Sequence, residues 1–210
     1  LYGYGERTLG VMPLYHTMGV RSLLASVLTN GTFVCMPKFD AGEAIAIIER
    51  GKIDNLYLVP TLYHDIVRHQ DFAPERVKTA RKLGFAGAPM TDHLLQQLDR
   101  LFKPDLLVNH YGSSEIYTCT IDQNARRKPG SAGKSGINQM IRVVALDAKG
   151  PNDIVPPGQE GQIIALLAGD EAFEGYWRRP EADEKSLRDG WFFSSDTGYF
   201  DKDGDLFVTG

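Results

Sequence analysis

Short apolar runs recur over roughly the first 118 residues, separated by stretches with a helical pattern. Each run has the length and composition of a buried strand and is bounded by polar or turn-forming residues. The expected strands are residues 9–11, 32–36, 55–59, 82–86 and 105–108.

Helical signals lie between these strands. Asp40 and Glu43 have the spacing of a capping box, and Gly51 is placed to end that helix. Thr91 can cap a second helix. Its apolar face would carry Leu94, Leu95, Leu98, Leu101 and Phe102. Strands that alternate with helices predict an α/β fold: a parallel sheet with flanking helices, which binds ligands beyond the carboxyl ends of its strands.

From about residue 119 the pattern changes to short strands joined by loops rich in glycine and proline. Strands are expected at residues 141–146, 162–167, 191–194 and 206–208, and Asp203-Gly204 is a hairpin signal. This pattern predicts a small, mostly antiparallel, β-barrel-like subdomain. We therefore divide the chain into an α/β subdomain, residues 1–118, and a β-rich subdomain, residues 119–210.

Composition narrows the class of protein. A net charge of -4 and a pI of 5.7 argue against nucleic acid or an anionic membrane as the main partner. The two cysteines, Cys35 and Cys119, match no disulfide or zinc spacing, which favours a cytoplasmic protein. The most apolar segment, residues 23–36, is interrupted by Asn30 and Gly31, so we expect no membrane span and no signal peptide.

Several well-known functional motifs are incomplete or missing in this chain. Gly133-Lys134-Ser135 is not a phosphate loop, because Lys128 stands where that motif needs its first glycine. His64 and His69 are five residues apart, which places them on different faces of a helix and argues against a metal pair. The basic run 126–128 is interpreted as a solvated loop. Neither a serine-hydrolase elbow nor a dinucleotide-binding glycine pattern is present.

Four segments, in order, resemble the motifs of the adenylate-forming superfamily, which contains acyl- and aryl-CoA ligases, luciferases and the adenylation domains of peptide synthetases. Each is weak alone, but the set is specific in this order and spacing. The chain looks closest to aryl-CoA ligases of the 4-chlorobenzoate and benzoate type. The segments are MPLYH at 12–16, FAGAPM at 85–90, NHYGSSE at 109–115, and GYWRRPE at 175–181 continuing to WFFSSDTG at 191–198.

The resemblance implies a ligase that activates a carboxylic acid with ATP as an acyl-AMP and then transfers the acyl group to the thiol of coenzyme A. It also implies a nucleotide site in which Tyr111 lies against the adenine, Asn109 binds the exocyclic amine and Asp196 accepts the ribose hydroxyls. The other nucleotide-binding residues by resemblance are Gly87, Ala88, Pro89, Gly112, Ser113 and Ser114.

Glu115 would hold Mg²⁺, since this hard cation prefers carboxylate and phosphate oxygens. Ser114 and Glu115 are the residues that the resemblance makes catalytic, because they would contact the reacting phosphate and its metal.

The resemblance also places an acyl pocket in the first subdomain, next to the adenine pocket. His16 would gate it. Its lining would be Thr17, Met18, Tyr57, Ala86, His110, Gly112, Tyr117 and Thr118. His110 and Tyr117 add polar groups, which favours a hydroxylated, longer or otherwise polar acid over plain benzoate. No aspartate occurs in residues 14–20, which disfavours an amino-acid substrate.

Two elements of this superfamily are not found: a phosphate loop before Leu1, and a C-terminal lid domain with its catalytic lysine after Gly210. We therefore expect the 210-residue chain to be an inactive or nearly inactive part of a larger enzyme, with exposed apolar surface that favours self-association. Two alternatives stay open for the whole protein: an adenylation domain that loads a carrier protein, and a catalytically silent binding module.

Overall fold

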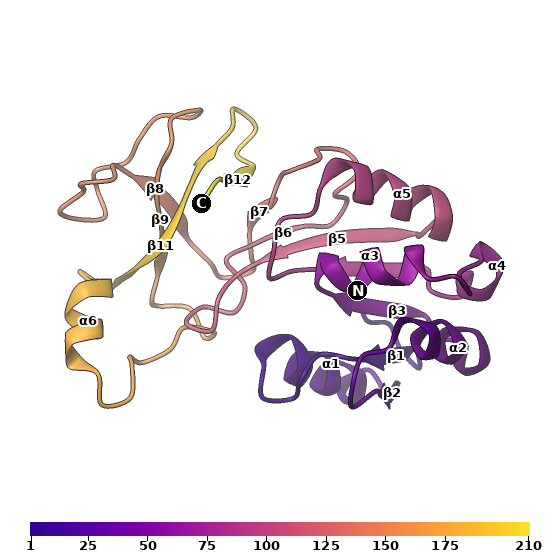
Figure 1. Cartoon of the computed structure of the whole chain (residues 1–210). Coiled ribbons are helices and arrows are strands. Elements are labelled where there is room, and N and C mark those ends of the chain that lie inside the picture. Colours follow the sequence, from indigo (N-terminus) through magenta and orange to yellow (C-terminus); the bar gives the residue numbers. More distant parts are fainter. The chain divides into compact units, whose positions relative to one another are not determined.

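The computed structural model describes residues 1–210, and the chain forms two compact units. Unit 1 comprises residues Leu1–Asn109 and Gln123–Gly130, and unit 2 comprises His110–Asp122 and Ser131–Gly210. The chain passes from unit 1 to unit 2 within strand β5, Leu106–Tyr111 (Figure 1).

Unit 1 contains the predicted parallel sheet. Its strands lie in the order β2-β1-β3-β4-β5, and each neighbouring pair is parallel. The four strands before β5 are β1 (Arg7–Gly10), β2 (Thr32–Cys35), β3 (Asn55–Leu58) and β4 (Lys82–Phe85). All five strands expected from the apolar runs are confirmed, with ends shifted by a few residues.

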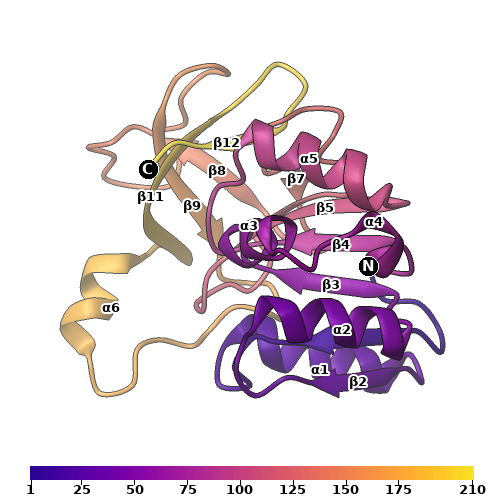
Figure 2. The same ribbon diagram turned by 45° about the vertical axis from the view of Figure 1, so that its right-hand side comes forward.

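Five helices flank this sheet. They are α1 (Thr17–Leu28), α2 (Ala41–Gly51), α3 (Pro60–Arg68), α4 (Pro74–Val77) and α5 (Asp92–Phe102). The chain moves outward from β1 to β2 and then back past β1 to β3, β4 and β5. Because such crossovers are right-handed, the reversal places α1 on one face and α2 to α5 on the other (Figure 2).

The helix starts agree with the capping residues read from the sequence. An Asp40 carboxylate oxygen accepts the Glu43 N–H at 2.8 Å, and Thr91 Oγ1 accepts the Leu94 N–H at 3.3 Å. The expected stop at Gly51 is confirmed, since α2 ends there. Gly51 is the last helical residue, and Lys52 takes the left-handed conformation with φ 50°. The next residue, Ile53, is fully buried, so packing of Ile53 fixes the turn at Lys52 without a glycine.

The core of unit 1 lies between the sheet and helices α2 to α5. It includes Leu9, Leu56, Leu83 and Leu107 from the strands, and the apolar face of α5 contributes Leu94, Leu95, Leu98 and Phe102. The helix periodicity predicted for α5 is therefore confirmed. No helix of the structure is both long enough and apolar enough to cross a bilayer.

Unit 2 contains the predicted antiparallel part. Strands β8 (Ile141–Val144), β9 (Gly161–Leu166), β10 (Leu187–Arg188), β11 (Trp191–Phe200) and β12 (Leu206–Val208) form one antiparallel sheet. Strands β10 and β12 pair with opposite ends of the long strand β11. Strands β6 (Thr120–Asp122) and β7 (Lys134–Ser135) form an antiparallel pair that continues the first sheet beyond β5, and helix α6 (Pro180–Ser186) completes the unit.

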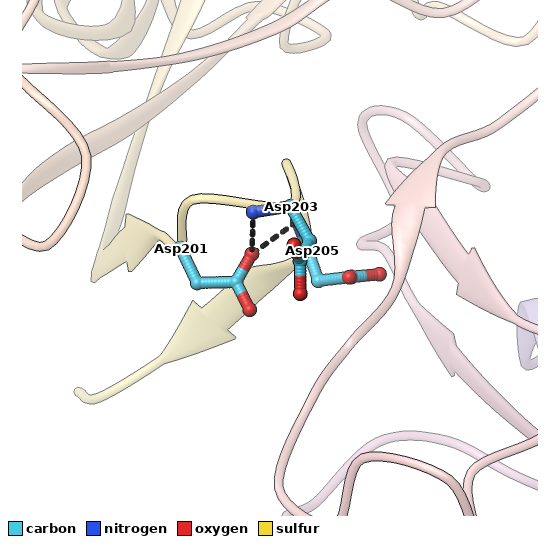
Figure 3. A group of neighbouring side chains, drawn as sticks. All are labelled: Asp201, Asp203 and Asp205. Atoms are coloured by element: carbon cyan, nitrogen blue, oxygen red, sulfur yellow. Dashed lines mark hydrogen bonds between the residues drawn. The ribbon is translucent and has the colours of Figure 1, made fainter.

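The turn between β11 and β12 is the predicted hairpin, with Gly204 at φ 78°. Asp201 accepts the N–H groups of Asp203 and Asp205 at 2.9 Å each (Figure 3). The three carboxylates of Asp201, Asp203 and Asp205 lie close together, and Lys134 Nζ lies 3.8 Å from the Asp205 carboxylate. These contacts account for the acidic cluster as a turn stabilised by hydrogen bonds and an opposing charge.

Candidate functional site

The segment after β5 folds into a tight reversal. The Ser113 N–H donates to Ile116 O at 2.9 Å, and the Cys119 N–H donates to Tyr111 O at 2.9 Å. A Cβ atom on Gly112 would lie 2.0 Å from the Tyr117 carbonyl oxygen, so only glycine fits there. The loop thus brings Tyr111, Ser113 and Glu115 close together from a few consecutive positions.

Ser113 closes this loop with its side chain. Its Oγ accepts the N–H groups of Glu115 at 3.2 Å and Ile116 at 3.3 Å, and these bonds leave its O–H available as a donor. Ser114 is exposed. The two serines therefore differ: Ser113 shapes the loop, whereas Ser114 is exposed to solvent.

Tyr111 and Asp196 meet although they are 85 residues apart. The Tyr111 hydroxyl donates to Asp196 Oδ2 at 2.6 Å. Asp196 lies where β11 shifts register against β9, between Phe193 and Thr197. Burial, together with the hydrogen bond to Asp196, raises the pKa of the Tyr111 phenol well above its usual value, so this group remains a donor. Asp196 Oδ1 keeps its capacity to accept.

Glu115 has a hydrogen-bond donor that the sequence did not single out. The Tyr176 hydroxyl donates to Glu115 Oε1 at 2.8 Å. Burial and this bond to Glu115 raise the pKa of Tyr176 to about 12, so the phenol stays protonated at neutral pH. The one available signal was the place of Tyr176 in the GYWRRPE segment, which gave the residue no role.

His110, Tyr117 and Thr118 form a polar group in the same unit. His110 is buried, and its Nε2 lies 3.2 Å from Thr118 Oγ1. The His110 and Tyr117 rings pack with centroids 5.0 Å apart. These expected acyl-pocket residues therefore contact one another, and they combine aromatic surface with hydroxyl and imidazole groups.

Unit 1 holds the remaining candidates. Met18, Tyr57 and Ala86 form a separate buried apolar cluster, against which Leu1, Met12 and Val59 pack. The cluster lies beside β1 and β3, between which the order of crossovers reverses, and such a point is the usual ligand position of an open α/β sheet.

Four other candidates of unit 1 lie at or after strand ends. Asn109 is partly buried on β5 opposite Phe85. Gly87, at φ 79°, Ala88 and Pro89 form an exposed turn directly after β4. This placement at the carboxyl edge is the one that the sequence predicted for a ligand-binding loop.

His16 and Thr17 begin helix α1. His16 is the N-cap, and its Nδ1 accepts the Met18 N–H at 3.2 Å while the side chain is exposed. Thr17 is the first helical residue and is partly buried. His16 therefore has a structural task as a cap, and its exposed ring is compatible with the gating role that the resemblance implies.

Three segments were given no binding role in the sequence analysis: the Gly-Lys-Ser segment, the two histidines and the basic run. Lys134 and Ser135 form the short strand β7, which confirms that this segment is no phosphate loop. His64 Nδ1 lies 3.4 Å from Asp65 and His69 Nδ1 lies 3.8 Å from Asp71, so the two imidazoles contact different carboxylates. The solvated-loop interpretation is wrong for Arg126, which forms an ion pair with Asp99 at 3.1 Å.

The chain resembles known proteins over its whole length. The model of the AMP-binding enzyme family matches residues 2–177. The 4-chlorobenzoate–CoA ligase of Arthrobacter sp is 28% identical over 210 residues, which are 100% of this chain and 40% of that protein. The feruloyl-CoA synthase of Amycolatopsis sp is 32% identical over 202 residues, covering 95% of this chain and 40% of that protein.

A solved structure agrees with the sequence comparison. The O-succinylbenzoate coenzyme A synthetase of Bacillus subtilis in complex with AMP superposes with a TM-score of 0.81 at 25% identity, covering 97% of this chain and 40% of that one. The chain thus spans about 40% of the length of these relatives. It belongs to the AMP-binding enzyme family.

Proposed function

We propose that the whole protein is an ATP-dependent acid–CoA ligase and that this chain supplies most of its acid and nucleotide contacts. The observation that carries the proposal is the loop after β5, where Tyr111, Ser113 and Glu115 lie together and Asp196 is bound to Tyr111. Family membership and relatives named for aryl-acid activation support the same reaction class.

The chemistry accounts for these residue types. A carboxylate is a poor acyl donor, so its oxygen first attacks the α-phosphorus of ATP and pyrophosphate leaves. The thiolate of coenzyme A then attacks the acyl carbon, and AMP leaves with the bonding electron pair. The protein must hold the nucleotide, offset phosphate charge and align the reacting atoms, because positioning and charge stabilisation supply most of the rate.

For the nucleotide, Tyr111 would lie against the adenine, and Asn109 would accept a hydrogen bond from its exocyclic amine. The turn of Gly87, Ala88 and Pro89 would supply further nucleotide contacts. Asp196 would accept ribose hydroxyls, chiefly through Oδ1, because Oδ2 already accepts from Tyr111. Gly112 lets the loop approach closely. The hydroxyls of Ser113 and Ser114 are donors of the kind that phosphate oxygens accept.

The residues present fit a magnesium ion. Glu115 keeps one oxygen, Oε2, without a hydrogen-bond partner in the protein, and a carboxylate oxygen is a preferred ligand of Mg²⁺. When bound with ATP, the ion would neutralise phosphate charge. Glu115 would hold it, and Ser114 would bind the neighbouring phosphate.

We infer an aryl acid with a polar substituent as the substrate class. Met18, Tyr57 and Ala86 offer apolar and aromatic surface, while His110, Tyr117 and Thr118 offer hydrogen-bonding groups. His16, with Thr17 beside it, would lie at the entrance. The 4-chlorobenzoate and feruloyl names of the relatives support an aryl acid.

Glu115→Ala in the whole protein tests the proposal. With ATP, coenzyme A and a panel of benzoic and cinnamic acids, AMP formation should fall by roughly 100-fold or more, since a metal-binding carboxylate is lost. The matched control is Glu184→Ala, an exposed glutamate on α6, which should retain wild-type turnover. Wild-type protein that forms no AMP with any acid, or a Glu115→Ala variant with unchanged turnover, contradicts the proposal.

The same assay separates the alternatives. A carrier-loading adenylation domain would form acyl-AMP and exchange pyrophosphate into ATP, but it would not transfer the acyl group to coenzyme A with release of AMP. A silent binding module would do neither.

A further inference from the structure

The segment that contains GYWRRPE is fastened to the loop that holds Glu115. The Phe173 N–H donates to the Glu115 carbonyl oxygen at 2.8 Å, and Ile116 and Ala172 form an antiparallel bridge. Phe173 packs edge-to-face against Phe192 of β11, with ring centroids 5.7 Å apart. The backbone of residues 172–173 therefore forms a fixed partner for the backbone of residues 115–116.

Tyr176 is held from three sides. Its backbone N–H donates to Asp183 Oδ1 at 2.8 Å, and Asp183 belongs to helix α6. Its ring packs edge-to-face on Phe173, with centroids 4.9 Å apart. Its hydroxyl donates to Glu115 Oε1. A phenol on a restrained ring is a stiff donor, so the position of Oε1 is set by the packing of unit 2 rather than by the flexible Glu115 side chain.

We propose that Tyr176 is a positioning residue for Glu115: by holding Oε1, its hydroxyl fixes the orientation in which Oε2 is presented to the Mg²⁺ that accompanies ATP. The inference rests on the proposed function. A free glutamate side chain has several rotamers and loses that freedom when it ligates a metal. A hydrogen-bond partner restricts the ligating side chain before the metal binds, so less rotamer freedom is lost on binding. Removing such a partner typically weakens metal binding by about 10- to 100-fold.

Tyr176→Phe in the whole protein tests this inference, because it keeps the ring packing and removes only the hydroxyl. The readout is ATP binding by titration calorimetry, once with Mg²⁺ and once with EDTA. We expect nucleotide affinity in EDTA to match the wild type, and the gain in affinity on adding Mg²⁺ to shrink by roughly 10-fold. Tyr199→Phe is the matched control, since the Tyr199 ring stacks on Phe207 with centroids 5.1 Å apart, and it should retain the full gain.

Glu115→Gln separates failure of this inference from failure of the proposed function. If Glu115→Gln loses the magnesium-dependent gain while Tyr176→Phe keeps it, Glu115 binds the metal but Tyr176 does not position it. If Glu115→Gln also keeps the gain, the metal role of Glu115 is wrong and the positioning role falls with it. Should Tyr176→Phe not fold, Asp183→Ala tests the same restraint through the Tyr176 backbone, and an unchanged gain there overturns the inference.

Discussion

The two cysteines occupy opposite environments, and their reactivity should differ accordingly. Cys35 is exposed on the edge strand β2, whereas Cys119 is buried. Burial, with the nearby carboxylates of Asp196 and Glu171, raises the pKa of the Cys119 thiol to about 12. The thiolate is the reactive form, so Cys119 should be inert at pH 8.

We predict that Ellman's reagent titrates one thiol per native chain and two in denaturant. Cys35→Ser should remove the fast-reacting thiol and leave native-state labelling close to zero. Two thiols that react at similar rates in the native protein would contradict the burial of Cys119.

The bond between Tyr111 and Asp196 should contribute to nucleotide affinity. Tyr111→Phe keeps the aromatic face but removes the donor at 2.6 Å from Asp196 Oδ2. A hydrogen bond to a charged group contributes about 1.5–3 kcal/mol, so we expect ATP to bind roughly 10- to 100-fold more weakly. Calorimetry on Tyr111→Phe, Asp196→Asn and the double variant gives their coupling, and strictly additive effects would show that the bond has no part in binding.

At the residue scale, the sequence motifs identified individual site residues but not the side chains with which they form hydrogen bonds. Tyr111, Glu115 and Asp196 follow from the resemblance of two short segments. The donors and acceptors that they meet lie 85 residues away for Tyr111 and 61 residues away for Glu115. A local pattern carries no information about such pairs, because the packing of unit 2 as a whole sets them.

Among the elements, strands were easier to predict than helix α1. Each strand of unit 1 is a short apolar run with turn residues at its ends, and the local signal agrees with its burial. Helix α1 reverses the usual pattern: its buried residues include Ser22 and Ser26, whose hydroxyls donate to carbonyls one turn earlier at 2.8 Å each. Of the large apolar side chains of α1, Met18 is buried, but Val20, Leu24, Val27 and Leu28 are exposed, so the hydrophobic pattern gave no amphipathic helix here.

An ion pair ties the chain before β1 to strand β4 and should make stability depend on pH. Lys82 Nζ lies 2.5 Å from Glu6 Oε1. Burial opposes ionisation of Glu6, but the hydrogen bonds from Lys82 and the Gly3 N–H outweigh it and lower the pKa of the carboxyl below its usual value. A lowered folded-state pKa stabilises the fold fully above the unfolded-state pKa of 4.5, and this contribution disappears as pH falls through the folded-state value.

Lys82→Met should therefore lower the free energy of unfolding at pH 7 by up to about 1 kcal/mol, as for partly exposed pairs, and by less at pH 3.5. Urea denaturation at both pH values measures the difference. Lys78→Met is the matched control, because its exposed pair with Glu75 at 3.8 Å should contribute little at either pH. An effect of Lys82→Met that is equal at pH 7 and pH 3.5 would exclude Glu6 as the titrating group.

At the scale of the whole molecule, the sequence predicted an α/β part and a β-rich part, but not the residues at which the chain passes from one unit to the other. Asn109 and His110 are consecutive, yet they belong to different units. The chain then returns to unit 1 for residues 123–130, where the Ala125 N–H donates to Leu107 O at 2.9 Å and Arg126 donates to Pro104 O at 2.7 Å. The basic run gave no sign of this return, because a charge pattern does not distinguish a solvated arginine from one that caps a carbonyl.

The outward face of α1 should govern how the 210-residue chain behaves in solution. Val20, Leu24, Val27 and Leu28 lie on this face with 40%, 54%, 65% and 85% exposure, at the spacing of a helical stripe. A continuous apolar stripe is unfavourable in water, and in a purified sample its only available cover is another copy. We predict that the chain elutes as dimers or larger species whose proportion rises with concentration.

Leu24→Glu with Leu28→Glu should shift this equilibrium to monomer, as measured by size-exclusion chromatography with light scattering. Both side chains are exposed, so the free energy of unfolding from urea denaturation should stay within about 0.5 kcal/mol of the parent value. Leu146→Glu is the control, because Leu146 is 66% exposed in unit 2 and lies outside the stripe. If Leu146→Glu shifts the equilibrium to monomer equally well, association is due to surface hydrophobicity in general and not to the α1 stripe. A parent chain that is monomeric at all concentrations would show that the stripe does not drive association.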